Sequence, residues 1–213
     1  MPLNKQQYPF AVTGIVRVAQ FMRAFDQRVP RFWDDHDQAI RPLRKALIAE
    51  EFQEFCDARS KVDMLDALCD LLYVTHGTLL ALGYRADLLV NTGLEQPLPA
   101  AVGRAVTQLS QQPCQKGDGD RIADLVATVI AVGERTFGVE NYRNAFYAVH
   151  ENNMNKLWTA KEYSAADPGA GLHAKVAAGR EETDRCYVVT RPDGKVVKPP
   201  GFEKVKLEKF VGN

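Results

Sequence analysis

Seven acidic residues lie within the short segment 50–70, where only Arg59 and Lys61 oppose them. The acids are Glu50, Glu51, Glu54, Asp57, Asp63, Asp66 and Asp70. Carboxylates at this density can hold a divalent cation or act as general acids and bases. The chemistry depends on whether they face solvent or face one another.

The segment 62–82 is predicted to be a helix that is apolar on almost every side, which is typical of a buried helix. Asp66 and Asp70 interrupt it four residues apart and so share one helix face. A helix predicted at about 42–59 likewise carries its glutamates among apolar residues. Buried carboxylates without a cation are costly or take up protons. Oxygen ligands of this kind select Mg²⁺ or Mn²⁺. The predicted ligands are Glu50, Glu51, Glu54, Asp66 and Asp70.

The alternative is a solvated acidic face on two surface helices, because charge runs are usually hydrated. This alternative is favoured for Asp57 and Asp63. For Asp66 and Asp70 the apolar surroundings favour the metal site.

The elements that must position these acids are mainly helices. Apolar periodicity predicts further helices at about 11–27, 97–111, 119–136 and 139–157. The strand-like run 186–190, the turn Pro192-Asp193-Gly194 and a return at Val196-Val197 predict a β-hairpin. We therefore expect an all-α helical bundle with a small C-terminal β-hairpin appendage. Residues 1–163 would form the helical domain and residues 164–213 a C-terminal extension.

Composition narrows the class of protein. Lys plus Arg and Asp plus Glu both number 27, so the formal net charge is zero. This balance argues against a general binder of nucleic acid or membrane surfaces, which needs a basic excess. No apolar run approaches the ~20 residues of a membrane span, and the first ten residues lack a signal-peptide pattern. We expect a cytoplasmic protein that binds neither nucleic acid nor membrane.

Four segments resemble the MazG-like and phosphoribosyl-ATP pyrophosphohydrolase-like superfamily. Ala49–Glu54 is similar to its EExxE motif, and Asp66–Tyr73 to its second acidic motif. Val149–Leu157 resembles the helix that closes the active site in phage- and plasmid-type members, and the C-terminal hairpin is similar to their tail. The position of the first acid in the ExxD motif falls on Ala67, and Asp66 substitutes one residue earlier.

The resemblance implies a Mg²⁺-dependent enzyme that hydrolyses a nucleoside triphosphate between its α and β phosphates, as a homodimer or homotetramer. Glu51, Glu54 and Asp70 fall on family ligands, and Glu50 is either a further ligand or the catalytic residue that takes a proton from water. Asn153 and Lys156 continue an apolar helix stripe and are predicted to bind substrate, although they could simply lie past the end of the core. The likeness of the tail to phage-type members favours a deoxynucleotide, and we expect a purine substrate, dGTP or dATP. Against the shorter members of the superfamily, residues at about 84–138 are a helical insertion in the pyrophosphohydrolase domain expected over residues 1–163.

Two rival functions remain open on the sequence. One is a phosphoribosyl-ATP pyrophosphohydrolase, which would use the same carboxylates. The other is a non-catalytic helical interaction module that docks through residues 97–136 and binds no divalent metal. Neither a GxxxxGK[ST] loop nor a GxGxxG or GxSxG motif occurs, so the common phosphate loops and the nucleophile elbow are absent.

Overall fold

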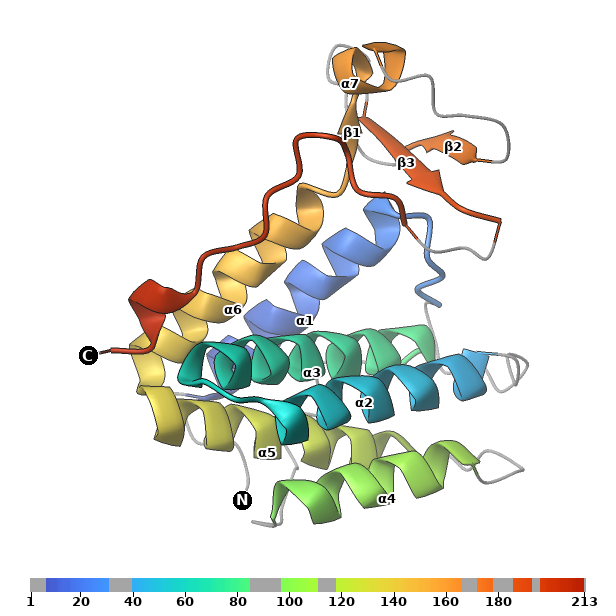
Figure 1. Cartoon of the computed structure of the whole chain (residues 1–213). Helices are drawn as coiled ribbons and strands as arrows, with labels where there is room; N and C mark the ends of the chain where they lie inside the picture. The colour runs from blue at the N-terminus through green and yellow to red at the C-terminus, as the bar shows by residue number, and fades with distance from the viewer. Residues whose placement is uncertain are drawn as a thin grey trace.

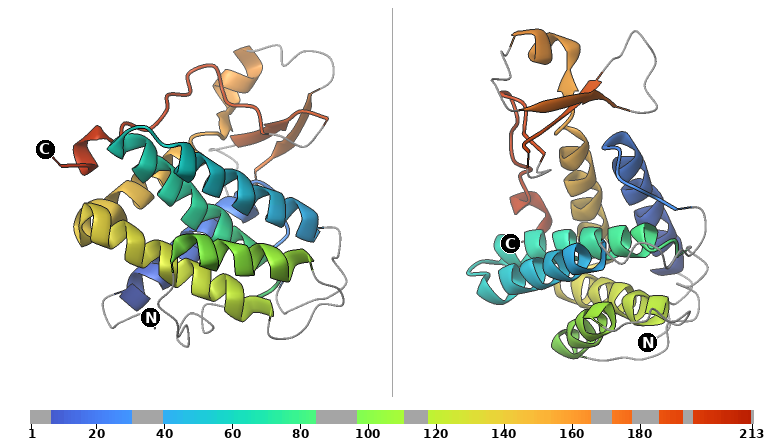
Figure 2. Two further views of the ribbon diagram at one scale, coloured as in Figure 1. Left: turned by 60° about the horizontal axis from the view of Figure 1, so that its bottom comes forward. Right: turned by 90° about the vertical axis from the view of Figure 1, so that its right-hand side faces the viewer.

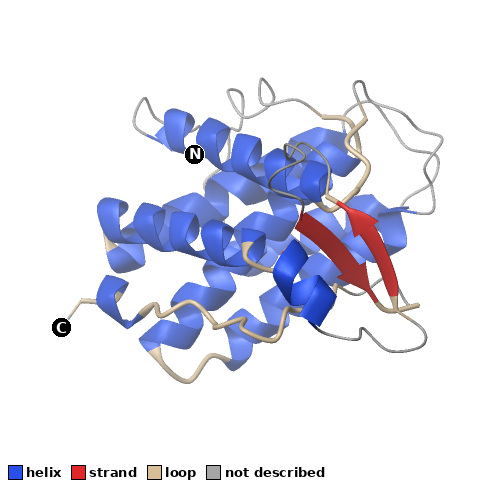
Figure 3. Ribbon diagram, turned by 90° about the horizontal axis from the view of Figure 1, so that it is seen from above, coloured by secondary structure: helices blue, strands red, loops and turns tan. Residues whose placement is uncertain are grey.

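The computed structural model describes residues 7–30, 40–84, 97–110, 118–165, 172–177, 186–192 and 196–212. Most of these residues are helical, and a small sheet lies near the C-terminus (Figure 1). The helices are α1 (Gln7–Ala24), α2 (Ile40–Asp57), α3 (Lys61–Ala81), α4 (Leu98–Ser110), α5 (Asp118–Phe137), α6 (Val139–Met154) and α7 (Ala160–Ala165). Viewed from above, helices make up nearly all of the molecule (Figure 3). The predicted all-helical bundle is confirmed.

Helix α3 is the centre of the bundle because it is apolar all round. It packs against α1, α2, α5 and α6, and leucines 65, 68, 71, 72 and 79 are fully buried. Ser60 caps its N-terminus by accepting a hydrogen bond from the Asp63 backbone N–H at 3.0 Å. Only three residues separate α2 from α3, so the two helices run antiparallel, side by side (Figure 1).

Helix α3 is also long and apolar enough to cross a membrane by length and composition alone. Most of its apolar window is buried inside the bundle, and the central helix of a water-soluble fold passes the same test.

Helices α4 and α5 belong to this same core. Helix α4 packs on α2 and α5, and α5 packs on α3, at the opposite end of the molecule from the sheet (Figure 2). Their apolar stripes, including Val102, Leu109 and Val129, are buried within the chain. Intramolecular packing explains their hydrophobicity, so the stripes give no reason to expect a dimer.

The approach of α6 to the bundle requires a glycine. A Cβ at Gly133 of α5 would lie 2.4 Å from the Tyr142 ring. Tyr142 is fully buried and donates a hydrogen bond to the Leu68 carbonyl of α3 at 3.2 Å. Gly133 therefore allows Tyr142 to connect α6 with the part of α3 that carries Asp66 and Asp70.

The small sheet differs from the predicted hairpin. It has three antiparallel strands in the order β1 (Trp158–Thr159), β3 (Cys186–Thr190), β2 (His173–Val176). The predicted return strand is reduced to a bridge between Thr190 and Val196 and a hydrogen bond from the Val197 N–H to the Val189 carbonyl. The predicted turn at 193–194 lies outside the described residues. Strand β2 is exposed along its whole length, so it lacks the hydrophobic alternation that would have identified it.

Candidate active site

Four of the predicted acids line one cleft of about 480 Å³. Glu51 and Glu54 come from α2, and Asp66 and Asp70 from α3. They meet because the two antiparallel helices pack against each other with these faces turned to the same side. The remaining lining residues are Phe21, Leu47, Tyr73, Val74, Val149, Asn152, Asn153, Lys156, Lys198, Phe202, Lys204 and Val205.

The carboxylates in this cleft are crowded and partly desolvated. Burial, followed by the charges of Asp70, Glu54, Glu50 and Asp66, raises the pKa of Glu51 from an ordinary 4.5 to about 8. Burial and the neighbouring Asp66 raise the pKa of Asp70 to about 7. Both carboxyl groups therefore hold protons near neutral pH unless further positive charge enters the cleft.

The C-terminal end of α6 adds an amide and an ammonium group to the cleft. The Lys156 ammonium donates to the Asn153 Oδ1 at 2.6 Å. Burial lowers the pKa of Lys156, although Asp70 and Glu51 favour its charged form. Behind Asn153, the Tyr73 hydroxyl lies 3.1 Å from the His150 Nδ1. The cleft thus places Asn153 and Lys156, both predicted as substrate-binding residues, beside the four acids.

The C-terminal segment, residues 196–207, supplies two lysines that the sequence analysis missed. Lys198 and Lys204 line the cleft, and the Lys204 ammonium lies 2.7 Å from the Asp66 Oδ2. That pairing raises the pKa of Lys204. The segment descends beside α6 (Figure 1). No motif marks these lysines, because their position depends on how the tail packs.

Several contacts hold this segment in place. Trp158 donates from its Nε1 to the Val197 carbonyl at 2.8 Å, and Asn152 donates from its Nδ2 to the Glu203 carbonyl at 2.6 Å. Leu207 is buried in the main core. Lys204 therefore lies on a segment that is held on both sides of it.

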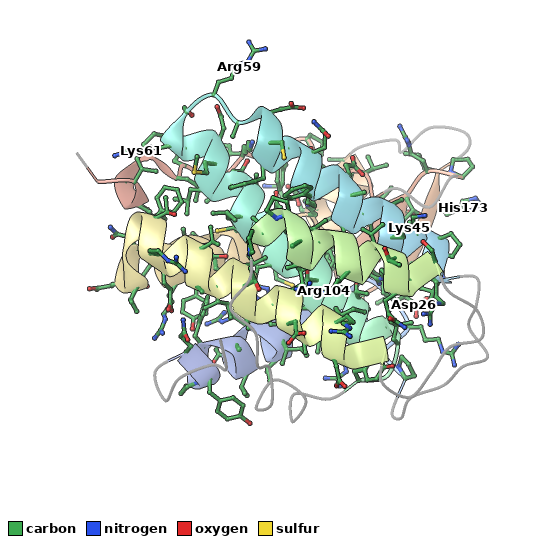
Figure 4. The ribbon with its side chains drawn as sticks, turned by 90° about the horizontal axis from the view of Figure 1, so that it is seen from below. Asp26, Lys45, Arg59, Lys61, Arg104 and His173 are labelled. Carbon is green, nitrogen blue, oxygen red and sulfur yellow. The ribbon has the colours of Figure 1, made fainter. Side chains whose placement is uncertain are left out.

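The two basic residues that lie closest to these acids in the sequence do not line the cleft. Arg59 and Lys61 are exposed at the turn between α2 and α3, and Arg59 projects outward from it (Figure 4). The positive charges facing the acids come instead from Lys156, Lys198 and Lys204.

Glu50, the remaining predicted ligand or base, is exposed and does not line the cleft. Its charge still contributes to the raised pKa of Glu51. Among the described residues, no three His, Cys, Asp or Glu side chains stand close enough together to hold a metal ion as placed. Any metal site here requires side-chain rearrangement, including separation of Lys204 from Asp66.

A second cavity of about 480 Å³ lies on the other side of Phe202. Its acidic lining residues are Glu162 and Glu203, and no lysine or arginine lines it among the described residues. The Glu162 carboxylate already accepts bonds from the Thr159 N–H and hydroxyl at 2.9 and 2.7 Å. The first cleft, which is lined by both acids and lysines, is therefore the better candidate for an active site.

Residues 18–91 match the family model for phosphoribosyl-ATP pyrophosphohydrolase. This segment is a domain of the MazG-like all-α NTP pyrophosphohydrolase superfamily. The resemblance seen in the sequence is confirmed, and it indicates a hydrolase. The pyrophosphohydrolase domain contains α2 and α3, and so all four carboxylates of the cleft, but not Asn153 or the three lysines. No curated protein and no solved structure matches the chain.

Proposed function

We propose that this protein is a Mg²⁺-dependent nucleoside triphosphate pyrophosphohydrolase that converts a (d)NTP and water into a (d)NMP and pyrophosphate. The observation that supports it is one cleft in which four carboxylates face three lysine side chains. Carboxylates suit the cation and lysines suit the phosphates, so the cleft matches a metal–triphosphate complex.

The donor set fits magnesium in type. Glu51, Glu54, Asp66 and Asp70 would hold the ion, and the raised pKa values of Glu51 and Asp70 indicate that these carboxyl groups need added positive charge to ionise together. The bound ion supplies charge neutralisation on the phosphates and makes water more acidic. Mn²⁺ would serve through the same oxygen ligands.

The lysines bind the phosphate oxygens in this proposal. Lys156 lies next to Asp70, and Asn153 holds its ammonium group in the cleft. Lys198 and Lys204 approach from the C-terminal segment. Together they offset the charge of a polyphosphate, which the four carboxylates alone would repel. Glu50 stays a predicted proton acceptor or ligand.

Phosphoribosyl-ATP is the second candidate substrate, because the matching family model carries that name. The same carboxylates and lysines would act on it, since it presents the same type of phosphoanhydride bond. A non-catalytic interaction module is a poorer fit, because it leaves the crowding of four acids in one cleft without a purpose.

The test is a panel of NTPs, dNTPs and phosphoribosyl-ATP with Mg²⁺, with products resolved by ion-exchange chromatography. We expect pyrophosphate and a monophosphate from a (d)NTP. Release of inorganic phosphate and a diphosphate, or no turnover of any compound, would refute the proposal. Turnover of phosphoribosyl-ATP alone would select the second candidate.

A further inference from the structure

A buried arginine lies near the acidic cleft, and none of the described carboxylates forms an ion pair with it. Arg44 of α2 is only 7% exposed. Its Nε has no hydrogen-bond partner, and no ion pair or hydrogen bond of Arg44 is found among the described residues. Burial lowers the pKa of Arg44 to about 10, and no carboxylate of the described residues offsets this effect. Buried guanidinium groups normally have acceptors, so this one calls for a ligand.

Arg44 lines a cavity of about 270 Å³. Its walls are mostly apolar and come from α2 and the end of α3, while Gln27 and Arg28 add polar groups. Leu47 lines both this cavity and the acidic cleft, so the two adjoin. Apolar walls with two arginine side chains, Arg28 and Arg44, which can only donate hydrogen bonds, suit a flat heterocycle that presents acceptors.

The spacing of residues along α2 and α3 fits a heterocycle in this cavity whose attached phosphates lie in the acidic cleft. Arg44 precedes Glu51 by seven residues on α2, and Gly77 follows Asp70 by seven residues on α3, which is about 10 Å in each case. A Cβ at Gly77 would lie 3.0 Å from the Arg44 Nη1, so the guanidinium rests where α3 has no side chain. A base is joined to its α-phosphate through a sugar that spans a distance of this order.

We propose that Arg44 and its cavity form the base subsite of the enzyme, and that the subsite takes guanine. This inference rests on the proposed function, because the acidic cleft locates the phosphates. Guanine places two acceptors, O6 and N7, side by side, and the guanidinium fork pairs with both. Adenine places an amino donor beside N7, so the donor-only arginine discriminates against it. Gln27 adds an amide that both donates and accepts.

The experiment measures kcat/KM for dGTP, dATP, dCTP and dTTP in the wild type, Arg44→Gln and Arg44→Lys. A bidentate contact is worth about 1–3 kcal/mol, so kcat/KM for dGTP should fall about 5- to 150-fold in both variants, with dATP changed much less. Lysine keeps the charge and loses the fork, so retention of dGTP activity in Arg44→Lys would mean that the site binds a simple anion and would overturn the proposal. The exposed Lys45 provides the control Lys45→Gln (Figure 4).

Gly77→Ala keeps the test valid if the Arg44 variants do not fold. The added Cβ contacts only the mobile end of Arg44 closely; its next contacts are at 3.7 and 3.8 Å. The variant should fold and should lose part of the preference for dGTP over dATP. An unchanged preference in folded Gly77→Ala, or equal losses for all four bases, would overturn the proposal.

Direct binding separates this inference from the proposed function. Calorimetry without metal should show that wild type binds dGMP more tightly than dAMP, and that Gly77→Ala and Arg44→Gln reduce the difference. If no triphosphate is hydrolysed but dGMP is still selected through Arg44, only the proposed reaction fails. If triphosphates are hydrolysed but dGMP is not preferred, only the guanine subsite fails. Dissociation of an oligomer by Arg44→Gln, seen by light scattering, would instead assign the cavity to a second copy and overturn the proposal.

Discussion

The Lys204 ammonium and the Asp66 carboxylate form an ion pair of 2.7 Å between the C-terminal segment and the central helix. Asp66 is one of the four carboxylates proposed to hold magnesium, and Lys204 is one of the three lysines proposed to bind phosphate. The two groups therefore neutralise each other's charge. A metal ion must compete with Lys204 for Asp66.

Lys204→Gln should shift the affinities for metal and substrate in opposite directions. Without the competing charge, Mn²⁺ should bind the free protein about threefold to tenfold more tightly, as expected for loss of about 1 kcal/mol of repulsion. Without the phosphate contact, KM for the triphosphate should rise about tenfold. Mn²⁺ titration by electron paramagnetic resonance and steady-state kinetics measure the two effects.

Lys206→Gln is the matched control, because Lys206 is exposed and does not line the cleft. It should leave both quantities unchanged. A purely structural Lys204 would weaken both affinities together, and that result would contradict the role proposed here.

Asp70→Asn should reduce kcat at least about 100-fold, since losing a metal ligand removes both water activation and charge neutralisation. The fold should survive, because an amide is easier to bury than a carboxylate. Asp63→Asn, on the exposed first turn of the same helix, is the control. Full activity in a folded Asp70→Asn variant would mean that Asp70 is not a metal ligand.

Stability without metal should decrease as pH rises. The folded protein keeps protons on Glu51 and Asp70 up to about pH 8 and 7, whereas the unfolded chain releases them near their ordinary values. Across about pH 4–8 the folded state thus binds more protons, so the free energy of unfolding falls with pH. Calorimetric Tm values should show this fall, saturating Mg²⁺ should reduce it, and Glu51→Gln should flatten it. A Tm that rises steadily over this range would be inconsistent with the raised pKa values.

Glu50 and Glu51 are adjacent in sequence but differ in exposure, and their glutamine variants test whether position in the cleft decides function. Glu51→Gln should lower kcat about 100-fold as a lost metal ligand, while Glu50→Gln should lower it less than about tenfold. Steady-state kinetics with matched circular dichroism spectra measure this. An equally large loss in Glu50→Gln would identify it as the further ligand or proton acceptor that the sequence predicted.

Two glycine substitutions test the packing of α6. Gly133→Ala places a methyl group against the Tyr142 ring and should cost about 1–3 kcal/mol as overpacking. Gly103→Ala, in α4 with nothing within 4 Å of the new Cβ, should gain about 0.5–1 kcal/mol from helix propensity. Urea denaturation gives both values. Equal effects at the two positions would mean that α6 does not approach α5 as described.

The sequence located the acidic half of the site because burial leaves a local signature. Asp66 and Asp70 stand out against an apolar helix, and Glu51 and Glu54 against an apolar strip. The basic half has no such signature, since Lys198 and Lys204 lie in a tail whose path depends on Trp158, Asn152 and Leu207. Arg44 was missed for the same reason: an arginine in the first turns of a helix is ordinary until tertiary packing buries it. Strand β2 was missed because an exposed strand of four residues has no hydrophobic period to detect.

The anchoring of Lys204 also affects the order in which the protein becomes functional during synthesis. The acids and Lys156 are all translated before residue 160, but Lys198 and Lys204 belong to the segment 196–207, which is translated later. Leu207, which holds that portion in the core, follows them. A nascent chain could therefore assemble its helices on the ribosome and still have no complete site. The proposed site would be complete only after residues 196–207 have left the exit tunnel and docked beside α6.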